Sequence, residues 1–291
     1  MSMFSFLDGS LEDVSFYGKN VFDKKLRSKS NLFRFGEEKD ENELLEKVYR
    51  DVFDHACIGD PCNFVRDYNK GELKKKMNKG TTTLGFIYQG GVILAVDSRA
   101  TQGSYIASQE VKKIIKINDF LLGTMAGGAA DCSYWERFLS KLCRLYELRN
   151  NQRISVAGAS KMLTNIFFHY RAYGLSAGVM IAGYDHDGPH LYYVDNDGSR
   201  VKDCKFSIGS GSLYAYGVLD TGYKYDLTDE EAIELGKRAI VVATNRDGGS
   251  GGVVRVYQIT SAGITKHVEG SDVSELHYSY FENEGKDPFK L

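Results

Sequence analysis

Thr81, Asp97 and Lys113 bring together a hydroxyl, a carboxylate and an ammonium at successive intervals of 16 residues, each in or beside a strand-like segment. Side chains on neighbouring strands can converge at one sheet edge, so the spacing is compatible with a single reactive site. A Thr hydroxyl is a poor nucleophile unless a nearby group accepts its proton, and a free α-amino group on the same residue can do so. The pattern indicates hydrolysis by a threonine at a chain terminus.

Such a terminus would have to be created, because Thr81 lies inside the chain and follows Gly80. In the uncut chain the Thr81 nitrogen is an amide without a basic lone pair, whereas a free α-amine has a reference pKa of about 7.7–8.0. A buried Lys113 ammonium would disfavour protonation of that amine, and Asp97 would keep Lys113 charged and in place. Gly80–Thr81 is therefore predicted to be a cleavage site cut by the Thr81 hydroxyl itself, since Gly tolerates a strained backbone.

Each of these residues also has an ordinary structural interpretation. Consecutive threonines suit the start of a strand, an Asp after a strand is commonly a turn residue, and a Lys is commonly a solvated charge. Their joint placement beside a Gly-Thr junction favours the chemical interpretation. Gly127, in a small-residue loop before an expected helix, could offer a backbone N–H to an oxyanion, and Asp131 or Ser133 could cap that helix.

Hydrophobic periodicity predicts the elements that would position these groups. The expected strands cover Thr83–Tyr88, Val92–Asp97, Val111–Ile117, Phe120–Met125, Ala177–Tyr184, Leu191–Val194, Val253–Ile259 and Ile264–Val268. The expected helices are Tyr134–Leu148, a Ser155-capped helix through Tyr170 stopped by Gly174, a short helix opening at Ser207–Ser212, and one begun by the capping box Thr228–Glu231. This order predicts an α+β fold in four αββα layers, with stacked sheets between outer helices.

Residues 81–291 are expected to form a single domain behind an arm of residues 1–80, which is charged and helix-like only within 43–53. The arm is interpreted either as a solvated tail without a role or as a removable pro-segment. The formal net charge of −2 and pI of about 6.3 give no basic field, so neither nucleic acid nor membrane is expected as a partner.

The five cysteines, an odd number and widely spaced, favour a reduced intracellular compartment: Cys57, Cys62, Cys132, Cys143 and Cys204. Cys57 and Cys62 with His55 could suggest a metal clip, but no second ligand pair follows, and no metal is expected. The N-terminus lacks the basic region of a signal peptide, and no apolar run approaches the roughly 20 residues that span a bilayer. A cytoplasmic and nuclear location is expected.

Several motifs together are similar to the proteasome beta-type subunits, and among them to the chymotrypsin-like (beta type-5) group. These motifs are Gly80–Leu84, Ala95–Thr101, Lys113, Gly123–Cys132, Gly209–Gly211 and Arg246–Gly252. The resemblance covers residues 81–291, whereas the arm matches only as a pro-segment of plausible length. Gly249 stands where many relatives carry a larger residue, a departure expected to affect loop packing more than catalysis.

The resemblance implies an N-terminal nucleophile hydrolase that cleaves peptides after large apolar residues. The implied catalytic residues are the nucleophile Thr81, its charge partners Asp97 and Lys113, the oxyanion donor Gly127, and the supporting network Ser210, Asp247 and Ser250. The implied substrate contacts are the backbone of Thr101, Gly127 and Ala129 and a pocket walled by Ala100, Val111, Met125 and Ala129. The alternative interpretations are that Met125 is core filler and that Ser210, between two glycines, serves only the turn.

The same resemblance implies assembly with other proteasome alpha and beta subunits in stacked rings, unfolded polypeptides as substrates, and no cofactor. Two alternatives remain open. The chain could be a catalytically silent ring subunit with a structural role, against which the intact set of Gly80, Thr81, Asp97 and Lys113 argues. It could also be a stand-alone amidase, which the apolar pocket disfavours.

Overall fold

The computed structural model describes residues 80–171 and 175–282, all within a compact unit of residues 75–291. A further unit, residues 1–74, lies outside the described residues. Three sequence predictions lie outside the described residues: the helix within 43–53, the group of His55, Cys57 and Cys62, and the helix stop at Gly174.

Two antiparallel five-stranded sheets form the centre of the described unit. The first has the order β10-β1-β2-β11-β12, with β1 (Thr82–Tyr88), β2 (Gly91–Val96), β10 (Lys205–Gly209), β11 (Val253–Thr260) and β12 (Gly263–Asp272). The second has the order β5-β6-β7-β8-β9, with β5 (Ile114–Asn118), β6 (Leu121–Gly127), β7 (Ala177–Asp185), β8 (Gly188–Val194) and β9 (Arg200–Lys202). A separate hairpin pairs β3 (Ala100–Gln102) with β4 (Tyr105–Ser108).

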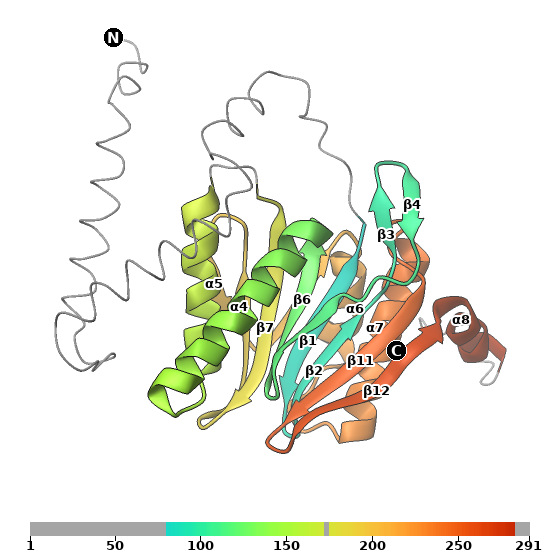
Figure 1. The fold of residues 1–291 in the computed structure, drawn as a ribbon. Helices are drawn as coiled ribbons and strands as arrows, with labels where there is room; N and C mark the ends of the chain where they lie inside the picture. Colours follow the sequence, from blue (N-terminus) through green and yellow to red (C-terminus); the bar gives the residue numbers. More distant parts are fainter. Residues whose placement is uncertain (1–79, 172–174, 283–291) are drawn as a thin grey trace, which may run out of the picture. The chain divides into compact units, whose positions relative to one another are not determined.

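Both faces of the first sheet are buried, which explains why β2 is apolar throughout. Ile93 and Ala95 pack with residues of α6 (Ser212–Gly222) and α7 (Asp229–Arg246), whereas Val92 and Leu94 pack against the second sheet. The helices α4 (Ala129–Asn150) and α5 (Val156–Tyr170) cover the outer face of the second sheet (Figure 1). The predicted α+β sandwich of stacked sheets between helices is confirmed.

Several local predictions are confirmed as well. Ser155 caps α5 by accepting a hydrogen bond from Gly158 N (3.0 Å), and Thr228 and Glu231 form the capping box of α7. The turn between β1 and β2 requires glycine, because Gly91 has a φ of 140° and a Cβ there would lie 2.1 Å from the Ile259 carbonyl oxygen.

The start of the first helix was predicted wrongly. It begins at Ala129 with Gly128 as N-cap, and neither Asp131 nor Ser133 caps it. Alanine has a high helix propensity, so the helix forms as soon as β6 ends. The Asp131 carboxylate instead accepts a hydrogen bond from Ser176 N (3.1 Å) and ties the helix to the segment before β7.

The segment from Ser207 also differs from its prediction, because Ser207–Gly209 belongs to β10 and the helix starts only at Ser212. Pairing with β1 supplies backbone hydrogen bonds that the local sequence does not reveal. Residues 111–113 precede β5 and are not part of it. The β3–β4 hairpin, β9 and the last helix, α8 (Val273–Glu282), were not predicted.

Candidate active site

The hydroxyl of Thr81, which stands directly before β1, meets the two charged groups expected around it. Lys113 Nζ donates to both Thr81 Oγ1 and Asp97 Oδ1, and Thr81 Oγ1 lies 3.1 Å from Asp97 Oδ1. All three residues are buried, with Thr81 7% and Lys113 4% exposed. The structure therefore brings a hydroxyl, a carboxylate and an ammonium into mutual contact.

Strand pairing places Asp97 beside Thr81. Because β1 and β2 are antiparallel, with Thr83 opposite Val96, Asp97 falls opposite Thr82, and its carboxylate reaches the hydroxyl of the preceding residue, Thr81. The Asp97 carboxylate is further fixed by backbone donors: Oδ1 accepts from Thr82 N (3.0 Å), and Oδ2 accepts from Gly251 N (3.0 Å). Its orientation is thus fixed by backbone donors as well as by Lys113.

Lys113 approaches from the other sheet, immediately before β5. Its carbonyl oxygen accepts a hydrogen bond from Met125 N (2.9 Å), which fixes the backbone from which the side chain extends. Burial lowers the pKa of the Lys113 ammonium, while the carboxylates of Asp97 and Asp247 oppose that shift. An amine in this environment can exchange a proton more readily than a solvated lysine.

The Thr81 nitrogen faces a separate chain of polar side chains. It donates to Ser210 Oγ (3.1 Å), and Ser210 Oγ donates to Asp247 Oδ2 (2.5 Å). Ser250 Oγ donates to the same Asp247 oxygen (2.6 Å) and lies 2.7 Å from Thr82 Oγ1. Ser210 follows β10, and Asp247 is the C-cap residue of α7, so separate elements meet around this nitrogen.

The expected oxyanion donor, Gly127, ends β6 directly before the N-cap of α4. Its φ is 104°, and a Cβ there would lie 2.8 Å from the Ser176 carbonyl oxygen, so the position requires glycine. Across the site Thr101, on β3, accepts a hydrogen bond through Oγ1 from Gly80 N (2.7 Å). Gly80, immediately before Thr81, is thus held by the hairpin that contains Thr101.

The expected pocket residues lie on the elements around these groups. Met125 is on β6, two residues before Gly127, and is 5% exposed, while Ser133 Oγ donates to its Sδ (3.2 Å). Ala129 is exposed at the start of α4, and Ala100 and Val111 are partly buried. The hydrogen bond from Ser133 restricts the conformation of the Met125 side chain.

Sequence reasoning missed the polar groups that hold the loops of the site. The Arg99 side chain donates to Gly248 O (3.0 Å) and to Gln109 Oε1 (3.0 Å), so it connects β2 to the loop after α7. Ser98 Oγ donates to Gln109 O and accepts from Val253 N (2.7 Å). The sequence did offer one sign of this role, since Ser98 and Arg99 come directly after Asp97. Polar residues beside a buried carboxylate commonly form the hydrogen bonds that hold the surrounding loops.

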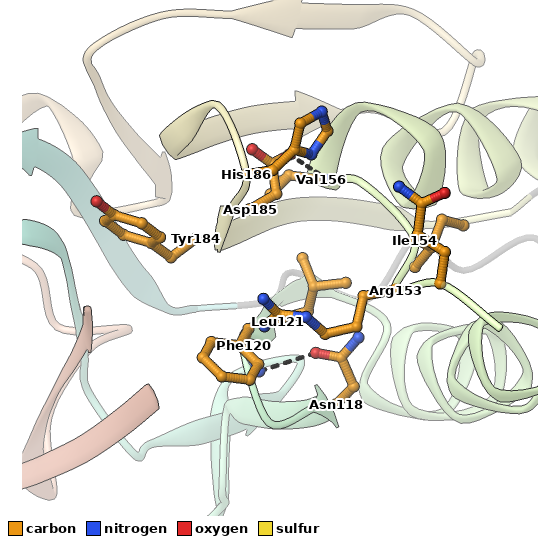
Figure 2. Close-up of a pocket in the computed structure, with 10 residues that line it drawn as sticks. Asn118, Phe120, Leu121, Arg153, Ile154, Val156, Tyr184, Asp185 and His186 are labelled. Atoms are coloured by element: carbon orange, nitrogen blue, oxygen red, sulfur yellow. Dashed lines mark hydrogen bonds between the residues drawn. The ribbon is translucent and has the colours of Figure 1, made fainter. Parts of the chain in front are cut away.

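A cavity of about 200 Å³ lies at the opposite end of β6 from Gly127 (Figure 2). The Arg153 guanidinium stacks over the Phe120 ring, with 3.9 Å between the guanidinium carbon and the ring centroid. Asp185 Oδ2, also at this cavity, accepts from Val156 N (3.0 Å). None of the predicted catalytic residues lines this cavity.

No helix in the described part of the chain is long and apolar enough to cross a membrane.

The comparisons with known proteins agree with this geometry. Residues 77–259 match the family described as "Proteasome subunit". The chain is 62% identical to proteasome subunit beta type-5 of Spinacia oleracea over 77% of this chain and 82% of that protein. It is 55% identical to beta type-5 of Dictyostelium discoideum over 80% of each chain, and 58% identical to beta type-8 of Homo sapiens over 71% of this chain and 75% of that protein. The chain belongs to the proteasome subunit family.

Proposed function

We propose that Thr81 is the nucleophile through which this chain acts as the chymotrypsin-like threonine endopeptidase of a 20S proteasome core. The observation that carries the assignment is the contact of Thr81 Oγ1 with both Lys113 Nζ and Asp97 Oδ1. Membership of the proteasome subunit family, with beta type-5 relatives, supports threonine peptidase activity for this chain. The contacts described above support the residue roles proposed below.

In the processed chain the Thr81 nitrogen would be a free amine facing the Ser210 and Asp247 network. The neutral amine takes the proton from Oγ, and the adjacent Lys113 ammonium stabilises the negative charge on that oxygen. The oxygen attacks the peptide carbonyl, and the Gly127 N–H is placed to stabilise the resulting oxyanion. The ammonium of Thr81 then protonates the leaving amine, and water hydrolyses the remaining ester with the amine again as base.

The same hydroxyl would cut the Gly80–Thr81 bond in the precursor. There the Thr81 nitrogen is an amide, so the Oγ proton would pass to Asp97 Oδ1, which accepts from Oγ, or to the neutral form of Lys113, and from there to the departing nitrogen. Attack on the Gly80 carbonyl transfers the acyl group from nitrogen to oxygen, and water hydrolyses that ester to release residues 1–80. Gly80 suits this step because its N–H is fixed by Thr101 and it lacks a side chain.

Substrate would bind as an extended strand against the backbone of Thr101, Gly127 and Ala129, in the manner of β-augmentation. The small and apolar residues Ala100, Val111 and Met125 would favour a large apolar side chain before the scissile bond. As a member of the proteasome subunit family, the chain assembles with other proteasome subunits. We propose that its ring neighbours are alpha and beta subunits and that its substrates are unfolded polypeptides. We also propose that it is located in the cytoplasm and the nucleus. Nucleic acid and membranes are not proposed as partners.

The mass of the chain recovered from its natural assembly tests the proposal. We expect the native chain to begin at Thr81 and the Thr81→Ala chain to retain residues 1–80. We also expect the native particle, but not the Thr81→Ala particle, to cleave peptides after large apolar residues. Thr81→Ser is the matched control, because it keeps the hydroxyl and should preserve both cleavages. A native chain that keeps residues before Thr81 would refute the proposal and favour a silent structural subunit.

A further inference from the structure

Arg255 is a buried cation whose charge acts on Lys113. It lies on β11 in register with Val96, the residue before Asp97, and is 6% exposed. No carboxylate of the described residues forms an ion pair with it, and its buried Nε has no hydrogen-bond partner among them. Glu269 lies opposite on β12, but its carboxylate binds Tyr257 Oη and Lys266 Nζ. Burying a charge without a counter-ion is unfavourable, so this arginine calls for a specific explanation.

The guanidinium holds the short segment that leads to Lys113. Arg255 Nη1 donates to Val111 O (2.7 Å), while Val111 N donates to Ser98 O (3.0 Å). The Val111 residue is thus fixed through both its carbonyl and its N–H, although residues 111–113 belong to no strand. Because Lys113 follows two residues later, Arg255 limits how far the Lys113 backbone can shift toward or away from Thr81.

The charge of Arg255 also acts on the same lysine. Besides the Thr81 side chain, Lys113 faces Asp97 and Asp247, which raise its pKa, and Arg255, which lowers it. A guanidinium stays charged over the whole working pH range, so its effect is constant. Burial would still lower the pKa of Lys113 after its removal, but the smaller lowering by the guanidinium would be lost, so the pKa of Lys113 and of a freed Thr81 amine would rise.

We propose that Arg255 is a positioning residue for the proposed reaction, which holds residues 111–113 in register with Thr81 and keeps a fixed positive charge behind Lys113. The proposal rests on Thr81 being the nucleophile. It assigns Arg255 no contact with substrate. Its consequence is that Arg255 acts on both the rate and the pH dependence of peptide cleavage.

The test compares assembled particles that carry Arg255→Met, Arg255→Lys or Lys112→Met. Arg255→Met keeps an unbranched, shorter side chain and removes the charge and the donor to Val111 O, whereas Arg255→Lys restores a charge and a donor. Lys112 is exposed and adjacent to Lys113, so Lys112→Met controls for the loss of a solvated charge. The readouts are kcat/KM against pH for a peptide with a large apolar residue, and the N-terminal mass.

We expect Arg255→Met to lower kcat/KM about tenfold, the effect of one hydrogen bond to a charged group. We expect the acidic limb of the kcat/KM profile, where activity rises with pH, to move to higher pH by about half a pH unit in this variant. The reason is that more of the Thr81 amine is protonated at a given pH. Arg255→Lys should restore the position of the limb and most of the rate, and Lys112→Met should change neither.

An unshifted acidic limb in Arg255→Met would overturn the proposal, even if the particle were less stable, because that is the result of a purely structural role. Equal behaviour of the Lys and Met variants would also overturn it. If Arg255→Met does not assemble, Arg255→Gln takes its place with the same criteria. If no neutral variant assembles while Arg255→Lys does, the charge serves folding and the proposal fails. Full activity of Thr81→Ala would instead refute the proposed function itself.

Discussion

Replacing Asp97 with asparagine removes the charge at the centre of the site and almost preserves its shape. Asp97 Oδ1 interacts with Thr81 Oγ1, Thr82 N and Lys113 Nζ, and Oδ2 accepts from Arg99 N (3.3 Å) and Gly251 N (3.0 Å). An asparagine amide has one oxygen, so whichever way it turns, its NH₂ group faces backbone donors. The substitution therefore creates a donor conflict and also leaves Lys113 without its nearest counter-charge.

The size of the effect follows from these contacts. Breaking a buried ion pair by removing one partner costs about 3–5 kcal/mol of stability. Lys113 limits this loss by giving up its proton, because burial already lowers its pKa and Asp97 opposes that shift. For the reaction, the loss of one charge-assisted hydrogen bond near the nucleophile is worth about 1.5–3 kcal/mol, so kcat/KM should fall roughly 10- to 150-fold.

The assay measures kcat/KM and the N-terminal mass for Asp97→Asn in the assembled particle. A second version of Asp97→Asn is made with residues 1–80 replaced by a leader that another protease removes, so that it begins at Thr81 without self-cleavage. Its kcat/KM then reports peptide cleavage alone. Asp119→Asn is the matched control, since Asp119 pairs with Lys116 at 2.6 Å on the surface, where loss of an ion pair has little effect. Activity of Asp97→Asn within threefold of the native chain, in a particle of native stability, would refute the reasoning.

Three other changes test separate parts of the structure. Gly80→Ala should slow release of the arm, seen by N-terminal mass, because a Cβ would lie 2.3 Å from Gly249 Cα. Burial holds the pKa of Glu136 well above its usual range, so as pH rises above about 4.5 the unfolded state loses that proton first and the native chain loses stability. Glu136→Gln has no such proton to lose, so its stability relative to the native chain should increase over the same pH range. Unfolding measured at several pH values tests this. An alkylating reagent at pH 8 should label exposed Cys204 in the folded domain but not Cys143, whose pKa burial raises to about 12, and labelling of Cys143 without unfolding would contradict the packing.

The parts of the site that could be predicted from the sequence are those fixed by strand geometry. Thr81 and Asp97 flank a tight antiparallel hairpin, so alternation and a Gly-Gly turn suffice to bring them to one edge. Helix caps such as Ser155 and Thr228 were equally accessible, because the residues that satisfy a helix N-terminus are local in sequence.

The parts that escaped prediction depend on neighbours distant in sequence. Ser207–Gly209 forms a strand because the edge of β1 offers it hydrogen bonds, and nothing local distinguishes it from the start of the following helix. Arg255 has the same difficulty: an arginine in a strand is normally taken as solvent-facing, and only the carbonyl of Val111 explains its burial. Glu136 lies on a helix whose charged residues are expected outside, yet it packs beside Gly123.

The geometry of the uncut chain also explains how the proposed activation can proceed without rearrangement of the site. Before cleavage the Thr81 nitrogen already lies 3.1 Å from Ser210 Oγ, and Thr81 Oγ1 already contacts Lys113 Nζ. Cutting the Gly80–Thr81 bond would therefore change the chemistry of one atom, from an amide that can only donate to an amine that can accept a proton, while its surroundings stay in place. Under the proposed function, the precursor is held inactive by the electronic structure of that nitrogen, and the site itself is assembled by strand pairing before any bond is cut.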